Sequence, residues 1–271
     1  MAPARFFGLA LLGLGLTSAC SVALDFDAVS AQESGNTGFC AKHPAPQAAF
    51  CDDFDGKPLG TVWSTLSQMN GTVAVDGKAS TSTPSSMLST ISAVPAGGSV
   101  RAVSTTSFPL LNSKPLGFRV SFDMQVEQFD KNPSAMITAF AFLYGPLNNY
   151  NEIVLNLSST GTDVKIQVVE NAEAGGFDKH GPYPLSAPIG GWINVRLELD
   201  IRTPNGTPPA GATNTLRVYL NQAEQEDGPL QVPLNGDVPR MELGIGYEDT
   251  SLARDAWSVR YDNFLVETAA L

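Results

Sequence analysis

The amino-acid sequence predicts an all-β protein, an antiparallel β-sandwich of about a dozen strands. Residues 190–201, GGWINVRLELDI, alternate apolar with polar side chains, so a strand here has one apolar face and one polar face. Shorter segments with the same period of two follow one another along the chain, and none of them has the apolar stripe of a helix. Two sheets packed face to face would bury the apolar faces of such strands.

Strands are expected, in order, near residues 48–56 and at residues 61–66, 87–94, 100–108, 117–127, 136–144, 152–157, 164–169, 190–201, 216–221, 241–247 and 257–266. Residues 117–127 alternate cleanly. Residues 136–144 are almost wholly apolar, and their short length before a Gly-Pro pair favours a strand over a helix. Residues 71–86 are rich in Ser, Thr and Gly and are predicted as exposed hairpin turns. Residues 170–190 are predicted as a long loop.

Composition limits the class of protein. The chain has 271 residues, which is enough for one large β domain. Hydrophobic residues make up 43% and charged residues 16%, which excludes a wholly disordered chain. The net charge of −11, without a Lys/Arg cluster, repels phosphate backbones. We therefore expect no nucleic-acid partner.

The N-terminal segment is typical of an exported protein. Residues 1–19 are predicted to be a signal peptide, because an apolar run follows Arg5 and is too short to span a bilayer about 30 Å thick. Residues 20–38 are polar and aperiodic, which predicts a flexible tether. Residues 39–271 are expected to form the folded domain.

Residues 16–20, LTSAC, resemble a bacterial lipobox, in which the cysteine is lipidated and becomes the new N-terminus. The usual pattern has leucine three places before the cysteine, where this chain has Thr17. The resemblance implies a lipid anchor on Cys20 and a location at the outer membrane or cell surface. The alternative is ordinary cleavage after Ala31.

Cys40 and Cys51 enclose a short loop with two prolines. In an oxidising compartment this spacing predicts one disulfide, with Cys20 left for a separate role. The alternative is three reduced thiols in a cytosolic protein.

Four segments, in this order, resemble the concanavalin A-like lectin/glucanase superfamily, including its laminin-G-like members. They are residues 50–56 (FCDDFDG), 191–197 (GWINVRL), 216–221 (LRVYLN) and 261–266 (YDNFLV). The resemblance covers about residues 48–267 and implies a jelly-roll sandwich. It also implies that the first and last strands pair, and that the two middle segments are neighbouring strands.

Many glucanases of this superfamily carry Glu-x-Asp-x-x-Glu on one strand, with two acids at the separation that retaining hydrolysis needs. The corresponding pair here is Glu198 and Asp200, but Thr203 replaces the third acid. The alternative is a solvated strand face. Asp123 and Glu127 form a second carboxylate pair on a predicted strand. No complete catalytic set is assigned.

His43 and His180 are too few for a histidine-rich metal site or several catalytic bases. Tyr150, Phe177 and Tyr183 lie in or beside predicted loops, where an aromatic ring can stack on a sugar. We expect these three aromatic residues to be ligand-binding candidates.

A calcium ion is predicted where the first and last strands meet. Asp53 and Asp55 follow the first strand and Asp262 lies on the last, and calcium prefers six to eight oxygen ligands. The alternative is that these acids cap turns.

Together these features favour a lipid-anchored, lectin-like surface module that binds carbohydrate or another surface partner. The alternative is a glycoside hydrolase or polysaccharide lyase whose acids come from different strands.

Overall fold

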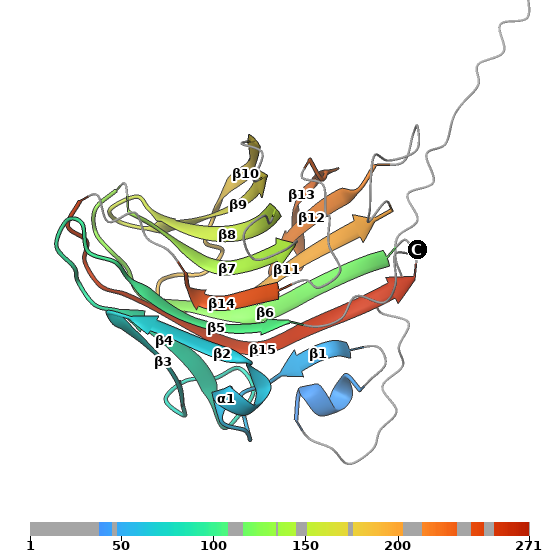
Figure 1. Ribbon diagram of the computed structural model, residues 1–271, viewed down its shortest axis with the longest axis horizontal. Coiled ribbons are helices and arrows are strands. Elements are labelled where there is room, and N and C mark those ends of the chain that lie inside the picture. Colours follow the sequence, from blue (N-terminus) through green and yellow to red (C-terminus); the bar gives the residue numbers. More distant parts are fainter. Residues whose placement is uncertain are drawn as a thin grey trace, which may run out of the picture.

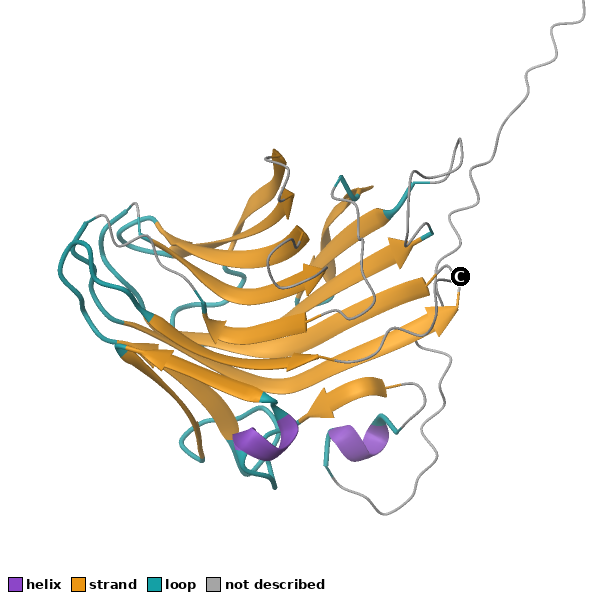
Figure 2. Cartoon of the chain, in the orientation of Figure 1, coloured by secondary structure: helices purple, strands orange, loops and turns teal. Residues whose placement is uncertain are grey.

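The computed structural model describes residues 38–44, 48–107, 116–133, 135–144, 151–172, 176–202, 213–231, 240–246 and 252–270. They form two antiparallel sheets packed face to face, with two short helical turns at one side (Figures 1 and 2). The predicted β-sandwich is therefore confirmed. The predicted signal peptide, Cys20 and all of the predicted tether except Gly38 lie outside the described residues. No helix among the described residues is long and apolar enough to cross a membrane.

Sheet A consists of β1 (Ala48–Asp52), β3 (Gly71–Asp76), β4 (Ser86–Ile91), β6 (Leu116–Gln128), β11 (Trp192–Ile201), β12 (Thr215–Leu220), β13 (Ala223–Pro229) and β15 (Trp257–Ala270). Its strand order is β13–β12–β11–β6–β15–β4–β3, and β1 also pairs with β15. The expected pairing of the first and last strands is confirmed, and so is the pairing of β11 with β12. The chain has the strand arrangement of a jelly roll.

Sheet B consists of β2 (Thr65–Met69), β5 (Arg101–Ser107), β7 (Met136–Tyr144), β8 (Asn151–Ser159), β9 (Val164–Ala172), β10 (Gly176–Pro184) and β14 (Arg240–Ile245). Its strand order is β10–β9–β8–β7–β14–β5–β2. The two helical turns are η1 (Cys40–Lys42) and α1 (Leu59–Val62).

The core lies between the two sheets and follows from the period-two pattern. Alternate apolar residues of β11, from Ile193 to Ile201, all face inward and are buried. Aromatic rings from both sheets meet there, and Phe122 of β6 lies 5.4 Å, centroid to centroid, from Phe140 of β7. The buried hydroxyl of Tyr261 donates a hydrogen bond to the Ala139 carbonyl oxygen, at 2.9 Å. The apolar faces predicted from the sequence therefore form one continuous core.

Two predictions near the N-terminus are wrong in detail. The strand expected at residues 61–66 is divided between α1 and β2, with Trp63 buried between them. The turns expected at residues 71–86 begin instead with β3, which pairs with β4 in full register. Ser, Thr and Gly there indicated turns, but β3 is a terminal strand whose exposed face accepts small polar residues.

The long loop expected at residues 170–190 is also wrong. Strand β9 continues to Ala172, and β10 occupies most of the remainder, with a register shift between His180 and Tyr183. Two prolines and two glycines made β10 look like a loop, and such residues are tolerated at the edge of a sheet. Strand β13 was not predicted, because its sequence AEQEDGP lacks apolar alternation.

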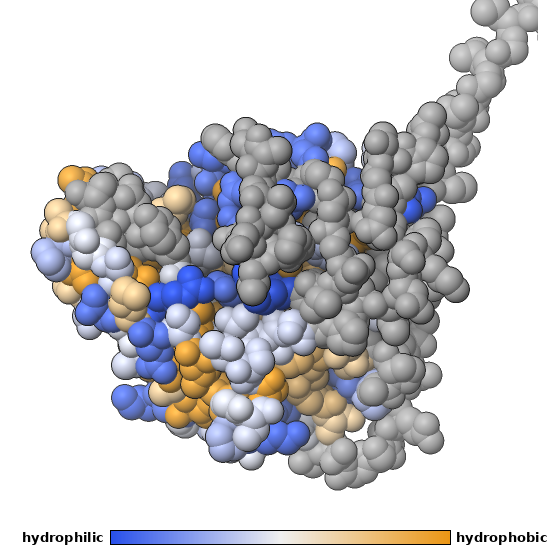
Figure 3. Space-filling model, in the orientation of Figure 1, coloured by the Kyte–Doolittle hydropathy of each residue, from blue (hydrophilic) through white to orange (hydrophobic). Residues whose placement is uncertain are grey.

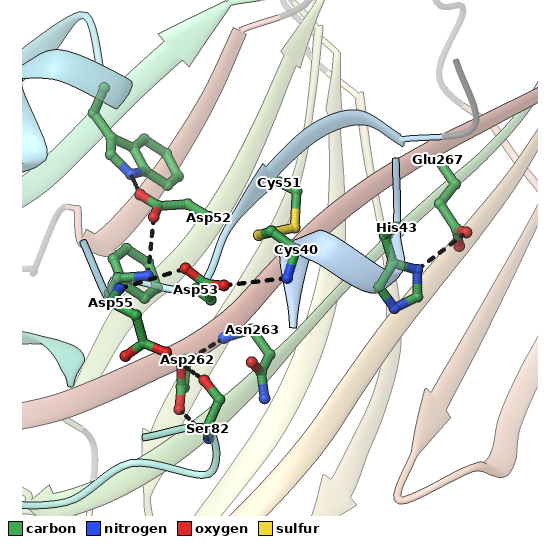
Figure 4. The surroundings of a disulfide bond; sticks show 12 residues. Cys40, His43, Cys51, Asp52, Asp53, Asp55, Ser82, Asp262, Asn263 and Glu267 are labelled. Atoms are coloured by element: carbon green, nitrogen blue, oxygen red, sulfur yellow. Dashed lines mark hydrogen bonds and ion pairs between the residues drawn. A yellow bond between two sulfur atoms is a disulfide. The ribbon is translucent and has the colours of Figure 1, made fainter. Parts of the chain in front are cut away.

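The predicted disulfide between Cys40 and Cys51 is confirmed (Figure 4). Cys51 lies in β1 opposite Leu265 of β15, and Cys40 begins η1. The Asp53 carboxylate also accepts a hydrogen bond from the Cys40 backbone N–H, at 3.1 Å. The bond therefore attaches the segment before β1 to sheet A.

Replacing both Cys40 and Cys51 with Ser should lower the free energy of unfolding by about 2 to 3 kcal/mol, because the unfolded chain regains the freedom of a short closed loop. Chemical denaturation of the exported protein and of the double variant measures the difference. A reductant should lower the stability of the wild type and leave the double variant unchanged. A wild type that responds no more than the double variant would contradict the prediction.

Candidate functional site

The predicted carboxylate pair Glu198 and Asp200 lies within a cluster of arginines on the outer face of sheet A. The Glu198 carboxylate is 3.0 Å from Arg119 Nη2 and 3.3 Å from Arg196 Nε. Arg217 Nη2 lies 3.5 Å from Asp200 Oδ2. The side chains of Glu198 and Asp200 are only 9% and 1% exposed, so this part of the strand face is not solvated as its polarity suggested. Both acids are held as buried ion pairs, in which loss of a partner is costly.

The second predicted pair, Asp123 and Glu127, is also engaged by neighbouring strands. Asp123 accepts hydrogen bonds from Asn194 Nδ2 at 2.9 Å and Asn263 Nδ2 at 2.8 Å. Glu127 accepts from Arg260 Nε. These contacts join β6 to β11 and β15, so both pairs act within sheet A.

The acids predicted to bind calcium lie close to β1 and β15, and each accepts hydrogen bonds from backbone amides (Figure 4). Asp53 accepts from Cys40 N–H, and Asp55 accepts from Ser85 N–H at 2.8 Å. Asp262 is fully buried and accepts from the N–H groups of residues 81, 82 and 263.

Burial raises the pKa of Asp262, and these amide hydrogen bonds oppose the rise. Among the described residues, no group of three or more His, Cys, Asp or Glu side chains has the geometry to hold a metal ion. These hydrogen bonds are the ones expected if the acids cap turns, which is the alternative to a calcium site. The calcium site stays a prediction.

Tyr183 and His180 lie on the inner side of β10, in a cluster with Glu170 of β9 and Glu226 of β13, which we call the His180 cluster. His180 Nε2 is 2.8 Å from Glu170 Oε1, and His180 Nδ1 is 3.7 Å from Glu226 Oε1. The Tyr183 hydroxyl donates to Glu226 Oε2 at 2.9 Å. The other Glu170 oxygen accepts from the Gln231 backbone N–H at 2.8 Å. The cluster joins the edge strand of sheet B to that of sheet A.

Charge and burial set the protonation of the His180 cluster. The hydrogen bond to Glu170 raises the pKa of His180, burial opposes the rise, and the charges of Glu170, Glu226 and Asp178 add to it. Burial and the bond to Glu226 raise the pKa of the Tyr183 phenol, which stays protonated as a donor. Tyr183 is only 9% exposed, so its ring is not an open platform for a sugar in this arrangement.

The other two aromatic candidates cannot be placed in a site. Tyr150 lies outside the described residues, and Phe177 lies in β10 with its side chain outside them. Their role in ligand binding stays a prediction.

The outer face of sheet B carries polar side chains, among them Glu242, which lies 2.6 Å from Arg101 Nη2 and 3.9 Å from Arg240 Nε. Register places many of them in two neighbouring rows across the strands. The first row contains, from β14 to β9, Arg240, Leu143, Glu152 and Asn171. The second row contains, from β14 to β10, Glu242, Ala141, Val154, Val169 and Lys179. The four apolar members form a small buried patch separate from the main core.

The two outer faces differ in charge. Among the described residues, the outward-facing positions of the sheet B strands carry Arg101, Lys165, Lys179 and Arg240, with Glu152 and Glu242 as the acids. On sheet A, the arginines 119, 196, 217 and 260 face the larger acidic set of Asp76, Asp123, Glu127, Glu198, Asp200, Asp262 and Glu267. The basic residues of an acidic protein are therefore in excess on one face, which attracts anions.

Solvent reaches this basic face at its polar residues. Lys165 and Lys179 are exposed, and the side chain of Arg101 is 33% exposed while pairing with Glu242 at 2.6 Å. Asn171 Nδ2 donates to Glu152 at 2.7 Å. Burial raises the pKa of Glu152, and the Glu242 charge adds to the rise against the effect of this hydrogen bond. Cations, amides and a carboxyl group on one surface can bind carboxylates and hydroxyls of a ligand.

Sequence reasoning missed this face. The alternation of apolar and polar residues at 164–169 does place Lys165 and Gln167 on the polar side of a predicted strand. That Arg101 and Arg240 share their face depends on β5 and β14 being neighbours, although they are far apart in the chain. No local pattern records that pairing.

If the predicted calcium ion binds only the folded protein, the melting temperature should rise with added calcium and fall with a chelator. The measurement uses metal-stripped wild type and the Asp262→Asn variant, whose response should be weaker. A wild-type melting temperature that is indifferent to calcium and chelator would leave only the turn-cap explanation.

Stability should depend on pH through His180. Because its folded pKa is raised, the pair with Glu170 contributes fully below the ordinary pKa of 6.5 and loses its contribution as pH rises through the folded pKa. The stability difference between wild type and His180→Gln, about 1 to 3 kcal/mol at low pH, should therefore shrink above pH 6.5. Denaturation from pH 6 to 9 tests this, with Lys179→Gln on the opposite side of β10 as control. A pH-independent difference would refute it.

The sequence matches no protein-family model and no curated protein. Solved structures with a similar fold exist. The endo-β-1,4-glucuronan lyase from the fungus Trichoderma reesei aligns with a TM-score of 0.59 and 14% identity, over 82% of this chain and 96% of that chain. The alginate lyase vAL-1 from a Chlorella virus aligns with a TM-score of 0.51 and 9% identity, over 78% of this chain and 95% of that chain. At these identities the comparison establishes the shared jelly-roll sandwich fold.

Proposed function

We propose that the outer face of sheet B binds an acidic polysaccharide. The observation that carries the proposal is the excess of basic side chains on this face, in a chain whose net charge is −11. Four Lys/Arg residues there accompany two acids, whereas the outer face of sheet A has more acids than arginines. Because the rest of the protein repels anions, a polyanion that approaches is directed to sheet B.

The other groups on this face suit a sugar. Gln167 and Asn171 offer amide groups beside the basic residues, and Glu152 offers a carboxyl group. Hydroxyl groups of a sugar can both donate to and accept from such side chains. A chain of uronic acids presents carboxylates as well, which arginine and lysine recognise by charge-assisted hydrogen bonds.

The shared fold supports this class of ligand. The two similar structures are named for action on glucuronan and alginate, and both polymers are chains of uronic acids. Proteins that share a fold often act on different substrates. The charge of the outer face of sheet B therefore provides an argument that is independent of the fold. Lipidation of Cys20 and display at the cell surface, as the sequence predicts, are part of the same proposal.

A second candidate is a polysaccharide lyase that acts on the same face. Elimination needs a base that removes the proton beside the sugar carboxylate and an acid that protonates the leaving oxygen. The fold of the glucuronan lyase and the raised pKa of Glu152 favour this candidate. Against it, the described residues on the outer face of sheet B include no His or Tyr, because His180 and Tyr183 face inward. Binding is therefore the primary proposal.

Replacing Lys165 and Lys179 together with Gln should raise the dissociation constant for glucuronan or alginate about 3- to 30-fold, since each exposed charge contact is worth about 0.3 to 1 kcal/mol. Titration calorimetry at low salt measures the change. The matched control replaces Lys57 and Lys78, exposed lysines away from this face, with Gln and should bind as the wild type does. Binding should also weaken with salt and be absent for a neutral glucan.

Equal affinity of the two double variants, or equal binding of neutral and acidic polymers, would contradict the proposal. The same samples separate binding from cleavage. A lyase generates a conjugated double bond whose ultraviolet absorbance grows with time, and Glu152→Gln should stop that growth if Glu152 takes part. Binding without such absorbance identifies a binding module.

A further inference from the structure

The two acids on the outer face of sheet B have different partners. Glu242 of β14 pairs with Arg101 and also lies near Arg240. Figure 3 shows hydrophilic side chains in a band across the middle of the molecule, where β14 lies in Figure 1. Glu152 of β8 has a neutral partner instead, the Asn171 amide, which donates to Glu152 Oε1 at 2.7 Å. No lysine or arginine in the described part of the chain forms an ion pair with Glu152.

The neighbouring strands do not neutralise Glu152. Register places Leu143 of β7 and Asn171 of β9 opposite it, and neither side chain titrates. Burial is the main reason that the pKa of Glu152 is raised, and the hydrogen bond from Asn171 opposes the rise. Of the charged groups that act on it, Glu242 of β14 raises this pKa and Arg240 lowers it by less. Glu152 is therefore a half-buried carboxylate without a cation to balance its charge.

An unbalanced acid on this face conflicts with the ligand that the face is proposed to bind. A sugar carboxylate that approaches the row of Arg240 and Asn171 meets the Glu152 carboxylate, and two adjacent carboxylates cannot both stay ionised at low cost. Protonation of one removes the repulsion and creates a hydrogen-bond donor, so that the pair shares one proton. Glu152 is the group that takes the proton, because it is half-buried whereas the carboxylates of a free polymer are solvated.

We propose that Glu152 takes up a proton when an acidic polysaccharide binds to the outer face of sheet B, and that it then donates a hydrogen bond to a carboxylate of the polymer. Proton uptake rests on the proposed function, and it makes that function depend on pH. The proton comes from solvent. Because Oε1 accepts from Asn171, the other carboxyl oxygen, Oε2, carries the proton, and an oxygen of the sugar carboxylate accepts the new bond.

Linkage sets the direction of the pH dependence. Because the complex holds one more proton than the free protein, affinity for the polymer rises as pH falls toward the pKa of Glu152. The other cations of the face, Arg101, Lys165 and Lys179, stay charged in this range and add no pH dependence. His180 titrates on the inner side of β10, so its effect is common to the wild type and to a variant at Glu152.

Titration calorimetry of the purified full-length protein with glucuronan, between pH 5 and pH 8, measures this dependence. The wild-type dissociation constant should rise about 3- to 10-fold over the range, since one linked proton changes it by at most about tenfold for each pH unit. Glu152→Gln should bind more tightly than the wild type at pH 8 and lose this pH dependence, because no carboxylate then repels the polymer. Two buffers of different ionisation enthalpy give the proton uptake near pH 5, which should fall to zero in Glu152→Gln.

The matched control is Glu224→Gln, the same substitution at an exposed acid of β13 in sheet A, which should keep the wild-type pH profile. Asn171→Asp adds a second carboxyl group beside Glu152 and should move the pH dependence to higher pH. Circular dichroism confirms that every variant is folded. Binding with the same pH profile in the wild type and in Glu152→Gln, or equal proton uptake in both, would overturn proton uptake by Glu152 and leave the proposed function standing. Absence of binding at every pH would overturn both.

Discussion

Aromatic packing between the sheets is the contact on which the rest of the structure depends. Phe264 of β15 in sheet A lies 6.1 Å, centroid to centroid, from Phe140 of β7 in sheet B, and it stacks at 5.9 Å on Phe122 of the neighbouring sheet A strand β6. These rings fix which side of each strand is buried, and burial of such large side chains provides much of the stabilisation of a core. Since side chains alternate along a strand, the same contact decides which residues appear on the two outer faces.

The two outer faces use their charges differently. On sheet A, the arginines form ion pairs with acids of neighbouring strands, and Arg119 bridges Glu198 and Glu267. These pairs hold β6, β11 and β15 together, at a desolvation cost that good geometry offsets. On sheet B, Lys165 and Lys179 remain exposed at the far end of the sheet from β2. The ion pairs that stabilise the fold therefore lie on the outer face of sheet A, and the excess positive charge that attracts anions lies on the outer face of sheet B.

The edges of the sandwich show a similar division. The β10/β13 edge is closed by ionisable groups, because the His180 cluster joins the two terminal strands beneath their surface. On the β2/β3 edge, residues 64–75 carry no charge, and β3 ends at Asp76, which pairs with Arg260. Gly71, at the turn between the two strands, would place a Cβ only 2.5 Å from the Thr90 carbonyl oxygen, too close for a larger residue. The β10/β13 edge can therefore respond to pH through His180.

The sequence by itself determined the fold class, the Cys40–Cys51 disulfide and most of the core strands, because period-two burial and loop spacing are local properties. It identified Glu198 and Asp200 as a close pair, but not the three arginines that surround them. It mistook β10 for a loop, since a strand at a sheet edge tolerates residues that usually mark turns. The basic face of sheet B was decided only by tertiary structure. Arg101 and Arg240 share this face through pairing of distant strands, and such pairings leave no pattern in the sequence.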